Sequence, residues 1–457
     1  MALELLLNLL LLAPWSWAKE IRMINKTIQQ KTPAKSRCDG SKRRPRMLYG
    51  LFGLLLAGGL AGTTSVLAQD SSITNTMVRL GGVMALQGDI SGLGQNMKAG
   101  LEAAFKGATV QGRSIEFVVL NDSYNPPDTV EATRKLLADG VFAMVGNVGT
   151  PTASVALPIL AEQKIPAVGF YTGADLLRPG IGDIINFRAS YTQEIAAVID
   201  AALRAGVKPN QVCAFVQNDS FGMSGMTGIK MALGKQPGTE ATIATLEQII
   251  AMPGENPQRN NIGPVGVYAR DTLFVRDGYQ SLKTWEQTTG NRCRLVVTVG
   301  TYAPNANFMA YARKLKNEPW VISAPSVVGA ESLKDEFRKY GIQENIIVTQ
   351  VVPALDSPLP IVESARKALG DKLGYISLEG YIVGRMFLAI LDKAGGTPTP
   401  ESFVRAVRGH RDECHQLAAM EDRRGHRDVL EMASAEPWIV GDRKVAVAPA
   451  RARPPVE

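Results

Sequence analysis

The segment FAMVGNVGTPTASVALPIL, residues 142–160, decides the fold class. A short apolar run ends at Val145, a glycine-containing turn follows, and Thr150 and Pro151 take the positions of a helix N-cap and first helical residue. Strand, tight turn and helix in this order form one βα unit of an α/β fold. Such a helix start offers free N–H groups, a hydroxyl and the positive end of a dipole, which favour a carboxylate or other small anion. Capping of its own helix is the simpler role for Thr150, and the two roles are compatible.

The same alternation continues on both sides of this segment. Nearly continuous apolar strands that alternate with one-sided helices predict parallel sheets covered on both faces. Two series of such units follow each other, so we expect two α/β lobes with a ligand cleft between them. The predicted strands are Val78–Met84, Ile115–Leu120, Phe142–Val145, one around Val168, Cys213–Val216, Leu295–Val299, Trp320–Ile322 and Ile346–Val351. The predicted helices are one through Met97 to Phe105, one starting near Asn125, one near Ala153–Leu160, Gln193–Arg204, one from Ser224 and Ser377–Leu391, and Met252–Gly266 is expected to be a loop.

The basic charge of the chain lies at its beginning. The formal net charge is +7, and residues 1–68 alone carry ten Lys/Arg against three acids, so residues 69–457 are neutral overall. Nucleic-acid binding loses its main support for this reason. The basic run at residues 42–46, the apolar stretch Leu48–Ala61 and the small residues Val66 and Ala68 predict a secretory signal peptide cleaved after Ala68. A membrane anchor is the alternative, but the stretch is short and contains four glycines.

Two cysteines lie in the predicted body of the protein, Cys213 and Cys293. In an exported chain they can pair, whereas the apolar run around Cys213 is equally consistent with a buried free thiol. No cysteine spacing typical of a metal site occurs, and we expect no metal and no cofactor. All three histidines fall between residues 410 and 426, in a charged segment, 408–457, that does not continue the α/β pattern. We interpret that segment as aberrant and disordered, the product of a frameshift or of foreign sequence.

Six segments together resemble the leucine/branched-chain amino-acid-binding proteins of bacterial ABC transporters, which are type I periplasmic solute-binding proteins. The segments are Val78–Gln95, Gly146–Leu160, Ile165–Leu177, Asn218–Gly225, Thr298–Asn305 and Ser323–Leu333. The resemblance implies two Rossmann-like lobes joined by three crossovers that close on a ligand like a hinge. On this template the chain divides into a surplus extension (1–46), a signal peptide (47–68), lobe 1 (77–190), lobe 2 (191–353), a return to lobe 1 (354–405) and the aberrant tail (408–457), with crossovers near Ser190, near Pro353 and in the tail.

The resemblance also implies the ligand site. Thr150 falls where the family places a hydroxyl on the ligand carboxylate, and Tyr171 and Gly173 fall where the carboxylate and amine are held. Phe221 and Tyr302 match aromatic residues that close from lobe 2, and Tyr191 also faces the cleft. Core packing is the alternative for each aromatic residue.

Two positions depart from the family pattern. Ser326 stands where amino-acid binders have an acid for the ligand ammonium, and Leu93 replaces an aromatic residue. A buried ammonium without a counter-charge is costly, so a standard amino acid is in doubt unless Glu331 or Asp122 reaches it. A carboxylate, an amide, a urea-like molecule or an aromatic acid fits equally well.

Other functional classes find less support. The glycines at 92 and 94 are displaced from the first strand and lack the third glycine of a dinucleotide-binding loop, and no histidine precedes residue 410 to act as a general base. We therefore expect no enzyme. The predicted function is that of a periplasmic, monomeric solute-binding protein of an ABC importer, with a small-molecule solute and a membrane permease as partners. The alternatives are a ligand-sensing module that signals through a partner protein and, less favoured, a nucleotide-dependent enzyme.

Overall fold

A computed structural model describes residues 72–254, 256–342, 345–407 and 436–439 of the 457-residue chain. The predicted extension, signal peptide and most of the tail lie outside these residues. No helix in the described part of the chain is long and apolar enough to cross a membrane.

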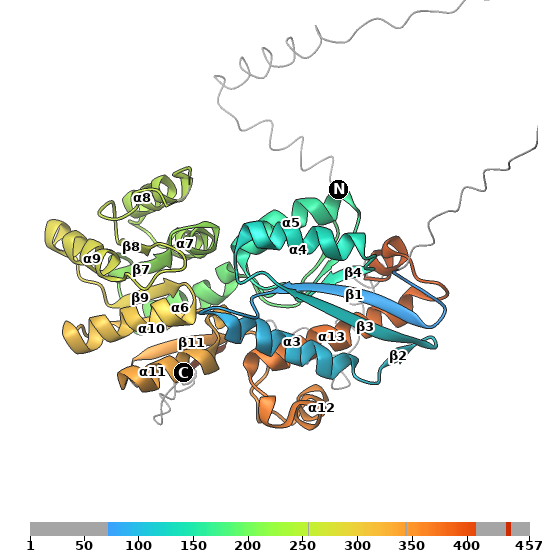
Figure 1. Ribbon diagram of the computed structural model, residues 1–457. Helices are drawn as coiled ribbons and strands as arrows, with labels where there is room; N and C mark the ends of the chain where they lie inside the picture. Colours follow the sequence, from blue (N-terminus) through green and yellow to red (C-terminus); the bar gives the residue numbers. More distant parts are fainter. Residues whose placement is uncertain (1–71, 255, 343–344, 408–435, 440–457) are drawn as a thin grey trace, which may run out of the picture. The chain divides into compact units, whose positions relative to one another are not determined.

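Two six-stranded sheets form the framework, and we call the units built on them lobe 1 and lobe 2 (Figure 1). The sheet of lobe 1 has the strand order β2-β3-β1-β4-β5-β6 and is parallel except for β2, which pairs with β3 in an antiparallel hairpin. Its strands are β1 (Met77–Met84), β2 (Thr109–Val110), β3 (Arg113–Asn121), β4 (Ala143–Val145), β5 (Ala167–Val168) and β6 (Ile184–Ile185). Its helices are α3 (Ser91–Phe105), α4 (Pro126–Ala138), α5 (Thr150–Glu162), α12 (Pro360–Leu369) and α13 (Tyr375–Ala394).

The sheet of lobe 2 has the order β12-β11-β10-β9-β7-β8, parallel except for β12. Its strands are β7 (Val212–Gln217), β8 (Val265–Tyr268), β9 (Leu295–Val299), β10 (Val321–Ala324), β11 (Ile346–Gln350) and β12 (Glu436–Ile439). Its helices are α6 (Tyr191–Arg204), which precedes β7, and α7 (Ser220–Leu233), α8 (Glu240–Ala251), α9 (Arg276–Thr289), α10 (Tyr302–Ala310) and α11 (Ala330–Tyr340). Short 3-10 or π-helical turns lie at Asp175–Leu177, Pro209–Gln211, Tyr311–Leu315, Ser326–Val328 and Gly370–Lys372.

The predicted α/β class with parallel sheets in two lobes is confirmed. The predicted strands fall within a residue or two of their positions in the structure. Strands such as β1, β4, β7 and β9 are continuous apolar runs that are almost wholly buried, whereas β3 is half-buried. The predicted loop at Met252–Gly266 is wrong at its end, where β8 begins at Val265. The helix expected from Ser224 begins four residues earlier, at Ser220, because the Asp219 carboxylate accepts a hydrogen bond from the Phe221 N–H and caps it.

Lobe 1 is completed by two helices that come from opposite ends of the described chain. Helices α3 and α13 pack against each other on one face of the sheet, with α4 and α5 on the other (Figure 1). Two glycines make the contact close: a Cβ on Gly100 would lie 2.1 Å from the Ser377 carbonyl oxygen, and one on Gly380 would lie 2.5 Å from the Met97 carbonyl oxygen. Lobe 1 is therefore completed only by the return of the chain after lobe 2.

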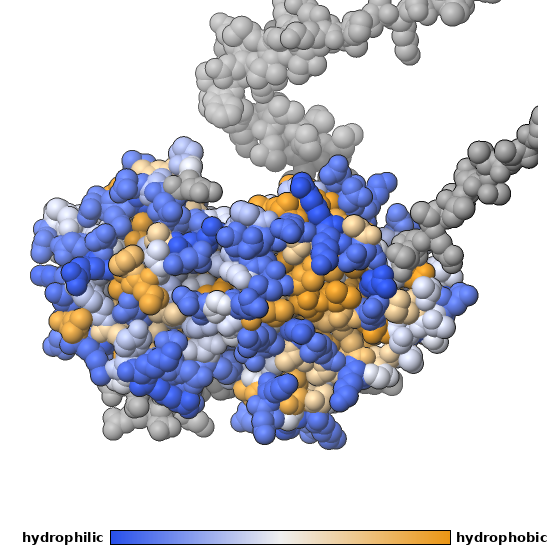
Figure 2. Space-filling view, in the orientation of Figure 1, coloured by the Kyte–Doolittle hydropathy of each residue, from blue (hydrophilic) through white to orange (hydrophobic). Residues whose placement is uncertain are grey.

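The outer strand of lobe 1 remains partly open. Strand β3 pairs with β1 over its length, from Met77 opposite Ser114 to Met84 opposite Asn121, but β2 covers only Arg113 and Ser114 on its other side. From Arg113 to Asn121 its residues are half-buried or, at Ser114, exposed, and Figure 2 shows hydrophobic surface over this part of lobe 1. In lobe 2 the edge of β11 is instead paired with β12, the part of the predicted aberrant segment that the structure describes.

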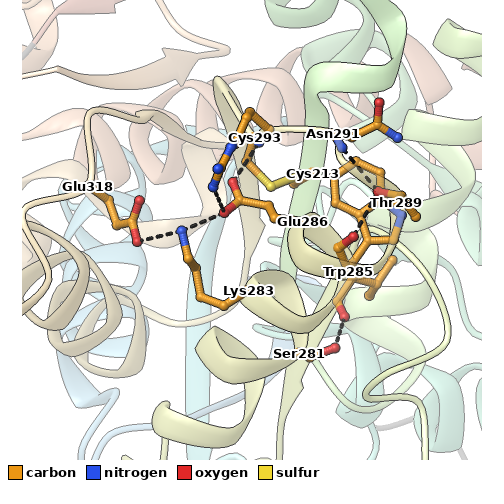
Figure 3. Close-up of a disulfide and its surroundings, with 11 residues drawn as sticks. Cys213, Ser281, Lys283, Trp285, Glu286, Thr289, Asn291, Cys293 and Glu318 are labelled. Atoms are coloured by element: carbon orange, nitrogen blue, oxygen red, sulfur yellow. Dashed lines mark hydrogen bonds and ion pairs between the residues drawn. A yellow bond between two sulfur atoms is a disulfide. The ribbon is translucent and has the colours of Figure 1, made fainter.

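A disulfide joins Cys213 in β7 to Cys293, which lies just before β9, and this settles the alternative that the sequence leaves open (Figure 3). The sulfur atoms are 1.99 Å apart and the bridge closes a separation of 80 residues. Glu286 sits beside it and accepts a hydrogen bond from the Cys293 N–H at 2.8 Å. Lys283 links Glu286 to Glu318, with nitrogen–oxygen distances of 2.5 and 2.9 Å. The bridge thus fastens the loop that follows α9 onto β7, a strand inside the lobe 2 sheet between β8 and β9.

Candidate functional site

One cavity lies where the carboxyl ends of the strands of both lobes meet. It encloses about 260 Å³ of space between atoms, part of which is open solvent. Ten residues line it: Leu93, Tyr124, Val148, Gly149, Thr150, Tyr171, Tyr191, Phe221, Thr301 and Val327. Most follow a strand directly, as expected for ligand sites of parallel α/β sheets. We call it the interlobe cavity.

Three hydroxyl groups meet at one side of this cavity, and we call them the hydroxyl cluster: Thr150, Thr172 and Tyr191. The Thr150 and Thr172 hydroxyl oxygens are 2.7 Å apart, and the Tyr191 hydroxyl lies 3.1 Å from that of Thr172 and 3.5 Å from that of Thr150. Burial raises the pKa of Tyr191, so this hydroxyl stays protonated at neutral pH and can donate a hydrogen bond. Donors of this kind suit an anionic oxygen.

The predicted position of Thr150 in its helix is wrong by one residue. Gly149, with φ 108°, is the N-cap of α5, and Thr150 is the first helical residue. The Thr150 hydroxyl forms no cap hydrogen bond and contacts Thr172 instead. A Cβ on Gly149 would lie 2.5 Å from the Tyr124 ring, so glycine is needed both for the backbone angle and for the space. Capping therefore does not account for the Thr150 hydroxyl, whereas the cavity does.

The structure brings five of the predicted site residues together around the cavity: Leu93, Thr150, Tyr171, Tyr191 and Phe221. The rings of Tyr191 and Phe221, which lie in the first turns of neighbouring helices of lobe 2, pack against each other with centroids 5.4 Å apart. Leu93 stands where the family has an aromatic residue, and its side chain forms part of the cavity wall. This replacement therefore changes the wall itself.

The other three predicted residues do not line the cavity. Gly173 supports Tyr191: its carbonyl accepts a hydrogen bond from the Tyr191 N–H at 2.8 Å, and a Cβ there would lie 2.6 Å from the Tyr191 ring. Tyr302 begins α10 and reaches Gly92 of α3 in the other lobe. Ser326 is buried in a neighbouring polar cluster, and the next residue, Val327, faces the cavity in its place.

Tyr124, Val148, Gly149, Thr301 and Val327 also line the cavity, although the sequence did not single out their side chains. Their signal was positional: Thr301 comes two residues after the end of β9, and Tyr124 three residues after β3. Tyr124 also joins the lobes, because its hydroxyl accepts a hydrogen bond from Gln217 Nε2 at 3.2 Å. Gln217 Oε1 in turn accepts from the Tyr268 hydroxyl, which itself accepts from the Thr301 N–H.

A buried charged cluster lies next to the cavity, and we call Arg188, Glu194 and Glu379 the arginine cluster. The Arg188 guanidinium lies 3.8 Å from a carboxylate oxygen of each acid and 4.5 Å from the centroid of the Tyr171 ring. It also donates a hydrogen bond to the Ser326 hydroxyl. Glu194 accepts hydrogen bonds from the Ser326 N–H at 2.7 Å and the Thr349 hydroxyl at 2.5 Å. Burial raises the pKa of Glu379 to about 7, although Arg188 acts in the opposite direction.

The comparisons with known proteins agree with this architecture. The sequence profile of the periplasmic binding protein family matches residues 77–247. A solved structure described as a possible leucine/isoleucine/valine-binding protein from Rhodopirellula baltica is 33% identical, with a TM-score of 0.64 over 74% of this chain and 86% of that one. These similarities define a solute-binding class of protein rather than an enzyme class. The chain belongs to the type I periplasmic binding protein family, and the predicted resemblance is confirmed.

Two further relatives are more distant. A branched-chain amino acid ABC transporter protein from Thermus thermophilus, solved with bound valine, shares the fold at 18% identity, with a TM-score of 0.57 over 74% of this chain and 84% of that one. The curated "Leu/Ile/Val-binding protein homolog 3" of Brucella melitensis is 24% identical over 168 residues, which are 36% of this chain. The match spans 45% of the length of that relative.

Proposed function

We propose that the chain is the exported solute-binding protein of an ABC importer. In the periplasm it captures a small polar solute, an amino acid or a related carboxylate or amide, in the interlobe cavity. It then delivers this solute to a membrane permease. Lobe 1 supplies Thr150 and Thr172 of the hydroxyl cluster, and lobe 2 supplies its third member, Tyr191, together with Phe221, Thr301 and Val327. No covalent chemistry is involved, and the protein acts as a monomer.

The observation that carries the proposal is the placement of Thr150. Its side chain is buried, lines the cavity, and belongs to the first turn of α5, where backbone N–H groups have no partner within the helix. A carboxylate seated here receives hydrogen bonds from the hydroxyls and gains from the helix dipole. Closure of the two lobes then buries the rest of the solute against the aromatic rings.

Ligand-dependent thermal stabilisation tests capture, because a ligand that binds only the folded state raises the melting temperature. The panel contains amino acids, dicarboxylates, monocarboxylates, amides and aromatic acids, and we expect one chemical class to raise it. Native mass spectrometry of protein purified from its source provides an independent search for retained solute. A panel without any effect, together with a protein that carries no solute, would contradict capture.

The variant Thr150→Val tests the proposed site for the ligand carboxylate at the start of α5, which we call the seat. It removes the hydroxyl but keeps the shape of the side chain, and we expect affinity for the solute identified by the panel to fall by about 1–3 kcal/mol. Thr152→Val is the matched control: it is the same change two residues later in α5, at a buried hydroxyl that bonds the Val148 carbonyl outside the cavity. Equal affinities of the two variants for that solute would place the ligand elsewhere.

A further inference from the structure

We infer that the interlobe cavity selects a small monocarboxylate without an α-ammonium group, rather than an amino acid. This inference rests on the proposed function and specifies its solute. The first step is the absence of charge in the wall: within the described part of the chain, none of the ten residues that line the cavity is acidic or basic. Two lining residues, Thr150 and Tyr191, hold their hydroxyl oxygens 3.5 Å apart, which suits the two oxygens of one carboxylate.

The second step is that the acids near the cavity are engaged elsewhere. Asp122 accepts hydrogen bonds from the Tyr124 N–H and the Thr129 hydroxyl, at 3.0 and 2.9 Å. Asp219 accepts from the Phe221 N–H and from Gln217 Nε2, at 2.9 and 2.7 Å. Both carboxylates therefore hold the loops that carry wall residues, and neither belongs to the wall.

The remaining acids are engaged as well. Glu331 accepts a hydrogen bond from the Tyr375 N–H at 2.7 Å, which ties it to the start of α13. Glu194 and Glu379 share Arg188 behind the Tyr171 ring. Neither of the two acids considered from the sequence, Glu331 and Asp122, lines the cavity.

The third step concerns the aromatic rings, which can also stabilise a cation. The Tyr171 ring already has the Arg188 guanidinium 4.5 Å from its centroid, and the rings of Tyr191 and Phe221 cover each other. A second cation against Tyr171 would meet like-charge repulsion from Arg188. An ammonium in this cavity would thus lose its hydration without gaining a counter-charge, which is a large penalty. An uncharged apolar tail meets Leu93, Val148 and Val327 instead.

The test uses three molecules with one carbon skeleton: 4-methylpentanoate, L-leucine and 4-methylpentanamide. Isothermal titration calorimetry with the full mature protein measures each affinity. We expect the acid to bind at least about 100-fold more tightly than leucine, because leucine brings an uncompensated ammonium. We expect the amide to bind more weakly than the acid, because it carries no negative charge to the hydroxyl cluster.

The outcomes separate the two proposals. Leucine binding as tightly as the acid, or more tightly, overturns the selection of a monocarboxylate and leaves capture in the cavity intact. An amide as tight as the acid overturns selection of an anion. If linear, branched and aromatic monocarboxylates of three to eight carbons all fail to bind while an amide or a dicarboxylate of the stabilisation panel binds, this inference is overturned and capture stands. If no compound of that panel binds, the proposed capture fails as well.

A variant of the cavity wall provides the converse test. Thr301 is the N-cap of α10 and forms no side-chain cap bond, so aspartate, a good N-cap residue, fits the position. Thr301→Asp places a carboxylate on the wall and should raise the affinity for leucine while lowering that for 4-methylpentanoate. Thr301→Asn has the shape of Thr301→Asp without the charge, so a comparison of the two variants isolates the effect of the carboxylate. The ratio of the affinity for leucine to that for 4-methylpentanoate should be higher in Thr301→Asp than in Thr301→Asn, and equal ratios in the two variants overturn the inference.

Discussion

The two lobes share a topology but treat their polar groups differently at the cavity. In lobe 2, the Tyr268 hydroxyl at the end of β8 accepts a hydrogen bond from the Thr301 N–H and donates one to Gln217 at the end of β7. In lobe 1, the Thr150 hydroxyl lines the cavity at the start of α5 and is bonded to that of Thr172. Lobe 1 therefore provides most of the proposed seat for a polar ligand group, whereas lobe 2 adds the Tyr191 hydroxyl and a cover whose polar groups are mostly bonded to one another.

The difference extends to how each sheet is held. Lobe 2 has buried central strands, a disulfide, and a stack of Phe215 on Phe308 with ring centroids 3.8 Å apart. Lobe 1 has a half-buried outer strand and depends on α13, which arrives late in the chain. In the proposed closure on a ligand, one lobe moves as a unit toward the other. The disulfide and the stacked rings of lobe 2 suit that role, and lobe 1 builds its part of the site from segments that are distant in the sequence.

The largest expected effect comes from the disulfide of lobe 2. In the double variant Cys213→Ala with Cys293→Ala we expect the free energy of unfolding to fall by about 4 kcal/mol, because a bridge across 80 residues restricts the unfolded chain strongly. Chemical denaturation under non-reducing conditions measures this. Ligand affinity should not change, since neither cysteine lines the cavity. If affinity falls while stability changes little, the disulfide determines the geometry of the cavity wall in lobe 2 rather than the stability of that lobe.

The next effect is a pH dependence that originates in lobe 1. Burial raises the pKa of Glu379 from 4.5 to about 7, so the folded protein keeps a proton that the unfolded chain releases between these values. The stabilisation from this proton is fully present below pH 4.5 and is lost as pH rises through 7, which amounts to about 3 kcal/mol. Denaturation midpoints at several pH values measure it.

Glu379→Gln should flatten this part of the pH profile, while Asp122, whose pKa burial raises to about 6, keeps a slope of the same sign. Glu363→Gln, an exposed position on α12, should leave the profile unchanged. A profile that is equally steep in Glu379→Gln and the wild type would place the titrating group outside the arginine cluster.

The smallest expected effect is on ligand affinity and comes from the hydrogen bond that joins lobe 1 to lobe 2 beside the cavity. Tyr124→Phe removes the hydroxyl that accepts a hydrogen bond from Gln217 in the other lobe, and we expect affinity to fall by about 1 kcal/mol because the closed state loses one bond. Tyr268→Phe is the control: it removes a hydroxyl whose two hydrogen bonds stay within lobe 2. We expect that control to lower stability more than affinity, and the reverse order would contradict the division into seat and cover.

The sequence predicted the framework because the central strands are continuous apolar runs, and Val83, Val145 and Phe215 are buried as such runs require. It missed α8 to α12, although several of them have local signals. Gly290 and Gly341 end α9 and α11 in the left-handed conformation, and Pro360 begins α12. The start of α9 is the weaker signal, because Val275 forms no side-chain cap bond.

The site was predicted in part. Thr150 and Tyr191 sit beside features that are visible locally, a helix start and a crossover, and both line the cavity. Tyr124 and Val327 lie in loops whose course depends on contacts far away along the chain, such as Tyr124 with Gln217. The arginine cluster was also missed, because it gathers residues 188, 194 and 379 from distant segments, and no spacing in the sequence reveals which acids share one arginine.

The close pairing of α3 with α13 has a consequence for synthesis. Gly100 and Gly380 are 280 positions apart, so the apolar side of α3 stays uncovered until nearly all of the described chain has left the ribosome. Folding with such long-range contacts is slow, because the entropy of closing a large loop is lost before the contact contributes any stabilisation. A nascent polypeptide of this design cannot complete lobe 1 early, a property that suits the proposed export of the chain before it folds.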